Sequence, residues 1–64
     1  MTPQFKNDLN FYTLETNESV EMAEAMAEAF LEKFNALGKY DQLQLSLLIQ
    51  VDGFEAGFKE LETL

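Results

Sequence analysis

The sequence contains no cysteine, no histidine and no tryptophan. Without cysteine there can be no disulfide, and without histidine as well most zinc and iron sites are excluded. The same two residue types are the usual carriers of acid–base and nucleophilic catalysis near neutral pH, so we do not expect an enzyme. A chain of 64 residues lacks the devices that commonly stabilise small domains, and self-association is the one that remains.

Positive charge is also scarce, because four lysines stand against twelve acidic residues and the formal net charge is -8. Such a surface repels phosphate backbones and anionic lipids, so direct binding to nucleic acid or to a membrane is not expected. The longest apolar stretch, Leu47 to Ile49, is far shorter than the roughly 20 residues that span a bilayer. The N-terminus also lacks the pattern of a signal peptide. We therefore expect a cytoplasmic protein.

Hydrophobic residues nevertheless make up 47% of the sequence, including six phenylalanines and two tyrosines. This composition is too apolar for a disordered acidic tail. We expect one small folded acidic domain over residues 1–64, with a loose start at residues 1–8. Residues 9–16 are rich in aromatic and β-branched types, and Leu9, Phe11 and Thr13 alternate with the residues between them. This pattern predicts a short strand or an extended arm.

The segment from residue 18 to residue 37 predicts an amphipathic helix, which Asn17 or Ser19 can cap. Its sequence consists almost entirely of good helix formers, and Gly38 follows where a left-handed residue can end a helix. On a helical projection, one face is apolar and another is acidic. The apolar face contains Val20, Ala23, Met26, Ala27, Phe30, Leu31, Phe34 and Leu37. The acidic face contains Glu18, Glu21, Glu24, Glu28 and Glu32, which we call the acidic ridge.

Residues 40–52 are compatible with a helix or with a strand. The strand interpretation rests on the alternation of apolar and polar residues from Leu43 to Val51. The helix interpretation rests on a seam with helical spacing that continues to the C-terminus, and we prefer it because leucine and glutamine are good helix formers. The seam consists of Tyr40, Leu43, Leu47, Val51, Phe54, Phe58 and Leu61. In either case Gly53 predicts a bend or a break.

The predicted fold class is therefore mainly α, with an N-terminal extended arm or short strand followed by an antiparallel helical hairpin. The alternative is an α+β fold, a β-α-β arrangement with a short C-terminal helix. No motif indicates a cofactor. The span from Asp41 to Asp52 has the length of a calcium loop but an apolar interior. Paired carboxylates such as Glu24 and Glu28 resemble a glycosidase pair or a metal clamp, but they would face water.

The acidic ridge is the main candidate site. It is either an ordinary solvated helix face or a binding surface for a basic protein groove, and the second interpretation is favoured because like charges at these spacings destabilise a helix. Tyr12 and Tyr40 are candidate apolar anchors beside it. Leu45, Leu48 and Ile49 lie off the seam and predict a second apolar face, which a homodimer or another protein would cover.

In size, charge and lack of catalytic residues, the chain resembles small acidic proteins of bacteriophages. These include nucleic-acid mimics that inhibit restriction, CRISPR, or host transcription and repair. The resemblance is one of composition and implies an inhibitor that occupies a basic nucleic-acid-binding surface of another protein, in the host cytoplasm if a phage encodes it. The alternative function is a homo-oligomeric assembly or adaptor module whose acidic residues serve solubility.

Overall fold

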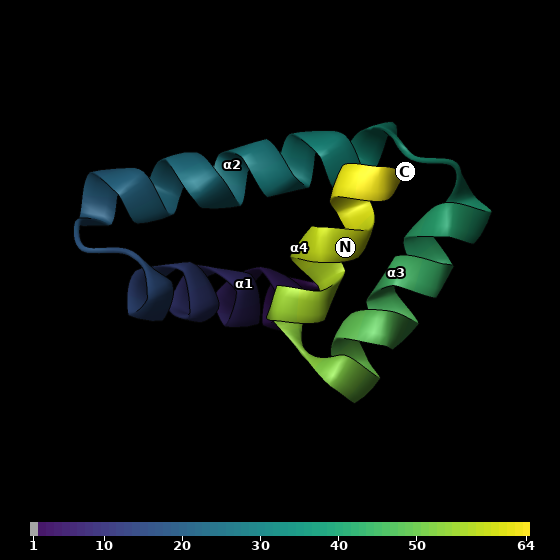
Figure 1. Ribbon diagram of the computed structural model, residues 1–64, viewed down its shortest axis with the longest axis horizontal. Coiled ribbons are helices and arrows are strands. Elements are labelled where there is room, and N and C mark those ends of the chain that lie inside the picture. The colour runs from purple at the N-terminus through teal and green to yellow at the C-terminus, as the bar shows by residue number, and fades with distance from the viewer. Residues whose placement is uncertain (1) are drawn as a thin grey trace.

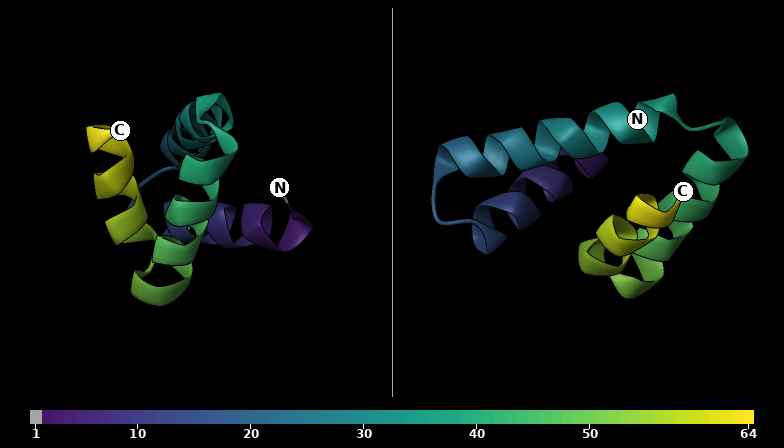
Figure 2. Two further views of the ribbon diagram at one scale, coloured as in Figure 1. Left: turned by 90° about the vertical axis from the view of Figure 1, so that its right-hand side faces the viewer. Right: turned by 45° about the horizontal axis from the view of Figure 1, so that its top comes forward.

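The computed structural model describes residues 2–64, so Met1 of the expected loose start lies outside the described residues. This part of the chain is mainly helical and contains four helices and no strand. They are α1 (Pro3–Thr16), α2 (Val20–Ala36), α3 (Lys39–Asp52) and α4 (Phe54–Thr63). In Figure 1, α1 runs beneath α2 in the opposite direction, and α4 runs back beside α3. The two pairs meet where α2 contacts α4, and the views of Figure 2 show the same arrangement.

The expected extended arm is wrong, because residues 9–16 belong to α1. Thr2 caps this helix by accepting a hydrogen bond from the Phe5 amide at 3.2 Å, and Pro3 occupies the first turn, where its missing N–H costs nothing. Leu9 and Thr13 are buried one helical turn apart. The helical start signal and the i,i+4 spacing of these residues outweigh the short aromatic alternation that predicted a strand.

The prediction of an amphipathic helix is confirmed by α2. Ser19 is its N-cap and accepts a hydrogen bond from the Met22 amide at 3.1 Å. The helix ends differently from the expectation, because Gly38 has an ordinary φ of -65°. The side chain of Gln42 instead donates to the carbonyls of Phe34 and Leu37, each at 3.1 Å. The free carbonyls at the end of α2 are thus satisfied by a residue of α3.

Residues 40–52 are helical in α3, so the strand alternative is wrong and the break near residue 53 is confirmed. Gly53 has a φ of 94° and separates α3 from α4, while its amide still donates to the Ile49 carbonyl at 2.8 Å. Only glycine readily adopts this combination with a ψ of 171°. The predicted long second helix is therefore two helices that fold back on each other.

This reversal changes which side of α3 is buried. The expected seam points outward in α3, where Tyr40, Leu43, Leu47 and Val51 are exposed, and inward only in α4, where Leu61 is buried. The opposite side of α3 enters the core. The two helices approach closely at Gly57, where an added Cβ would lie 2.8 Å from Ile49 Cδ1.

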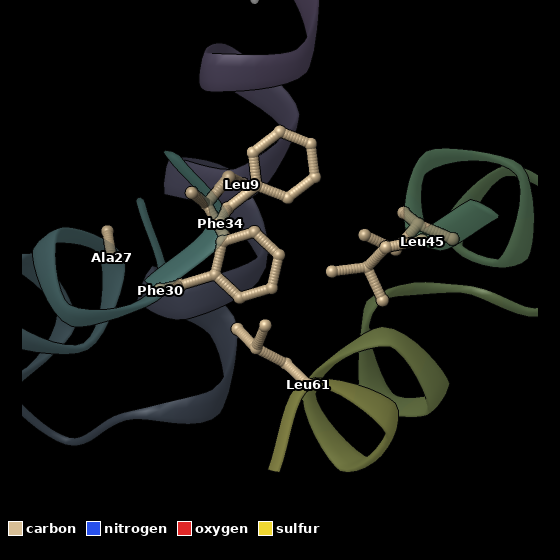
Figure 3. Packing of buried hydrophobic residues seen from close by; sticks show 7 residues of the cluster. Leu9, Ala27, Phe30, Phe34, Leu45 and Leu61 are labelled. Carbon is tan, nitrogen blue, oxygen red and sulfur yellow. The ribbon is translucent and has the colours of Figure 1, made fainter. Parts of the chain in front are cut away.

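The core lies between the two helix pairs and combines aliphatic side chains with stacked rings. Figure 3 shows Phe30 and Phe34 of α2 between Leu9 on one side and Leu45 and Leu61 on the other. The Phe30 ring lies 5.9 Å from that of Phe34 and 4.6 Å from that of Phe58, measured between centroids. Within residues 2–64, no helix has the length and the apolarity needed for a membrane crossing.

Candidate acidic binding surface

The acidic ridge is exposed along α2. Glu21, Glu24, Glu28 and Glu32 lie in the helix, and all four are exposed to solvent. Their spacings of three and four residues place them on one side of α2, over roughly 16 Å of its axis. Glu18 is also exposed but precedes the helix, in the loop between α1 and α2. The ridge thus consists of four carboxylates on a helix and one on the adjoining loop.

No lysine neutralises these glutamates in the described part of the chain. The ion pair present among residues 2–64 joins Lys59 and Glu55 within α4, with 3.7 Å between the charged atoms and both side chains largely exposed. Lys33 belongs to α2 but lines a cleft of about 240 Å³ between α2 and α4, together with Glu62. Within these residues, no ion pair with a lysine therefore offsets the negative charge of the ridge.

A shallow cleft of about 220 Å³ between α1 and α2 adjoins the ridge. Glu24 lies at this cleft, which is also lined by Asn10, Thr13, Leu14 and Val20. Leu14 and Val20 are both exposed large apolar side chains. They provide exposed apolar surface next to the ridge, which the sequence did not predict, although Val20 belongs to the predicted apolar face. Leu14 is apolar, but its position beside the ridge can be predicted only once residues 9–16 are known to be helical.

The two tyrosines are not placed together. Tyr12 is partly buried, and its ring stacks on that of Phe54 and is tilted against that of Phe58, with centroids 5.4 Å apart in each case. It therefore contributes to the packing of α1 on α4. Tyr40 is 73% exposed at the start of α3. Neither residue lines the cleft beside Glu24, where the exposed apolar side chains are those of Leu14 and Val20.

Burial raises the pKa of the Tyr12 hydroxyl above its ordinary value of 10.0, and the nearby carboxylate of Glu55 raises it further. The folded protein thus holds this proton more tightly than the unfolded chain. The corresponding stability is fully present below pH 10 and is lost as the pH rises through the raised pKa. We expect Tyr12→Phe to lose less stability than the wild type between pH 9 and pH 11.5, as measured by urea unfolding. Equal losses would contradict this role, and Tyr40→Phe is the control.

The expected oligomer interface of Leu45, Leu48 and Ile49 is wrong as an exposed face. Leu45 and Ile49 are buried in the core of the chain itself, and Leu48 is partly buried against it. The reason is that α4 folds back onto this side of α3. Their side chains are therefore occupied within one molecule, and the exposed apolar residues of α3 lie on its other side.

Across residues 2–64, no three acidic side chains converge closely enough to hold a metal ion. The exposed acidic residues are instead spread along the surface. Comparisons with protein-family models, with curated proteins and with solved structures found no match to this chain.

Proposed function

We propose that this protein binds a basic nucleic-acid-binding surface of another protein and blocks or modulates it. The observation that carries the proposal is the acidic ridge, whose carboxylates are exposed and unpaired with lysine within the described residues. The role is one of binding, without chemistry on the partner. It agrees with the compositional resemblance to small acidic phage proteins that inhibit defence or host systems.

The spacing of the ridge supports this choice of partner. Successive carboxylates in α2 are separated by about 4.5 to 6 Å along the helix axis. One strand of double-helical DNA carries a charge about every 3.4 Å of axis, so the two charge densities agree within a factor of two. A groove whose lysines and arginines bind the phosphates of a nucleic acid would meet a similar row of negative charges on α2. Charge complementarity would accelerate the encounter.

Affinity also needs apolar contact, because exposed ion pairs alone are worth little. Leu14 and Val20 supply this contact beside Glu24, in the cleft between α1 and α2. A basic groove with an apolar rim would cover both the charges and these side chains. The proposed binding surface therefore comprises the acidic ridge and this cleft.

The test is a charge reversal on the ridge. Immobilised wild-type protein should capture nucleic-acid-binding proteins from a nuclease-treated lysate at 50 mM salt, and added duplex DNA should displace them. We expect Glu24→Lys combined with Glu28→Lys to weaken the captured complexes at least about tenfold, because both attraction and steering are lost. Raising the salt to 500 mM should have a similar effect on the wild type, since the ridge is exposed to screening.

The matched control combines Glu60→Lys with Glu62→Lys, which changes the net charge equally on the exposed surface of α4. Its binding should stay within about threefold of the wild type. Equal losses in the two double variants would show a dependence on overall charge alone. Undiminished binding by the ridge variant would refute the proposal.

A further inference from the structure

Four large apolar side chains lie exposed along one side of α3. Tyr40, Leu43, Leu47 and Val51 are 73%, 57%, 47% and 80% exposed. Their spacings of three, four and four residues place them on one side of the helix, which we call the α3 face. A contiguous apolar surface of this kind on a small domain marks an interaction site.

Charge indicates which partner covers the α3 face. Residues 42–51 form the longest stretch of the sequence without a charged residue, in a chain with a net charge of -8. Two copies of such a chain repel each other wherever their carboxylates meet. Contact through α3 avoids this, because its apolar side chains are flanked by neutral residues, including Gln44 and Gln50.

The ends of α3 indicate how two copies are oriented. Lys39 lies at the N-terminal end of the helix and Asp52 at its C-terminal end, and both are exposed. Each charge is unfavourable toward the dipole of its own helix. In an antiparallel pair, the N-terminal end of each α3 lies beside the C-terminal end of its partner, so the two helix dipoles attract, whereas a parallel pair would bring the two Asp52 residues to the same end. The same arrangement places Tyr40 opposite the partner's Val51 and Leu43 near the partner's Leu47.

We infer that two copies of this protein pair through the α3 face, with their α3 helices antiparallel around a two-fold axis. The inference is independent of the acidic ridge and of its proposed partner. Helix α3 is only about 21 Å long, and its face is smaller than the roughly 800 Å² per partner of a standard interface. We therefore expect a weak dimer, which forms only in the upper part of the concentration range tested below.

The first test is sedimentation equilibrium of the wild type between 5 µM and 1 mM. The average mass should rise from the 7.3 kDa of one chain toward twice that value. Leu47→Lys should raise the dissociation constant at least tenfold, because it places a charge in the centre of the interface. Phe11→Lys, at an exposed apolar position on α1, is the matched control and should associate like the wild type.

The second test examines orientation by disulfide cross-linking, for which the absence of natural cysteine is an advantage. A mixture of Tyr40→Cys and Val51→Cys chains should form mixed disulfides under mild oxidation, at least fivefold faster than either variant links to itself. Both positions are highly exposed, so these substitutions leave the fold intact. Faster linkage of like with like would overturn the antiparallel arrangement.

Dimerisation through the α3 face and binding of a basic partner should respond to salt in opposite directions. Screening reduces the repulsion between two copies with a charge of -8, so dimerisation should strengthen between 50 mM and 500 mM salt. Capture of a basic partner by the ridge should weaken over the same range. A wild type that stays monomeric to 1 mM at both salt concentrations, or a Leu47→Lys variant that dimerises normally, would overturn the inference and leave the ridge proposal unaffected.

Discussion

Replacing Leu45 with alanine should remove most of the protein's stability at 25 °C, whereas the same replacement at Leu47 should leave the stability nearly unchanged. Leu45 is 1% exposed and lies in the core between the two helix pairs, but Leu47 is 47% exposed on the opposite side of α3. Leucine-to-alanine substitutions in a core cost about 2–5 kcal/mol. A domain of this size has only about 3–5 kcal/mol of total stability, so the loss at Leu45 consumes most of it.

Urea unfolding followed by circular dichroism at 222 nm measures this difference directly. The Leu47→Ala variant should lie within about 1 kcal/mol of the wild type when measured at 5 µM, where the proposed dimer contributes little. The pair is well matched, because both residues are leucines of the same helix and both changes remove the same atoms. Comparable losses at the two positions would mean that α3 does not present these sides as described.

Replacing Gly53 with alanine should cost about 1–3 kcal/mol, the second largest effect expected here. The reason is conformational, since no atom lies within 4 Å of the added Cβ but the backbone has a φ of 94° and a ψ of 171°. An L-residue is strained in this region of backbone space. Without the turn at Gly53, α4 cannot fold back onto α3, and the core loses Leu61.

Two controls isolate the backbone effect at Gly53. In Gly38→Ala, the added Cβ also has no atom within 4 Å, but the backbone at this position has a φ of -65°. Its stability should stay within about 0.5 kcal/mol of the wild type, because a weaker N-cap and a stiffer unfolded chain oppose each other. A synthetic chain with D-alanine at position 53 has the mirror-image preference and should be at least as stable as the wild type. If L-alanine and D-alanine behave alike, the turn does not depend on this conformation.

Helix α2 could be predicted from the sequence because its signals all agree. The cap at Ser19, the good helix formers and the separation of apolar from acidic residues each indicate the same element. Its buried residues Ala23, Ala27, Phe30 and Phe34 all belong to the predicted apolar face. Local information was sufficient here, since α1 and α4 both pack on the one side of α2 where its buried residues lie.

Helix α1 and the orientation of α3 were predicted wrongly for different reasons. In α1, the alternation of apolar residues over a short window indicates a strand, whereas Thr2 and Pro3 are typical of the start of the helix that forms. In α3, the predicted seam assumes that helical spacing keeps its phase across Gly53, although a bend or break is expected there. The turn removes any fixed phase between α3 and α4, and which side of α3 is buried then depends on tertiary packing.

The candidate surfaces also differ in whether local sequence or packing between helices determines them. The positions of the glutamates on α2 follow from helical spacing alone, so the ridge could be read from the sequence, apart from Glu18, which lies before the helix. Tyr12 and Leu45 could not be placed in this way, because their burial depends on how α4 docks on α1 and α3. The exposed α3 face and the cleft beside Glu24 likewise result from packing between helices.

The pairing of neighbouring helices also affects how quickly the chain reaches its native state. Helix α1 packs on α2 and α3 packs on α4, so most native contacts join segments that are close in the sequence. Proteins with such local topology fold in microseconds to milliseconds, since little loop-closure entropy is lost before contacts form. The contacts between α2 and α4 join more distant segments, so we expect them to form after those within each helix pair.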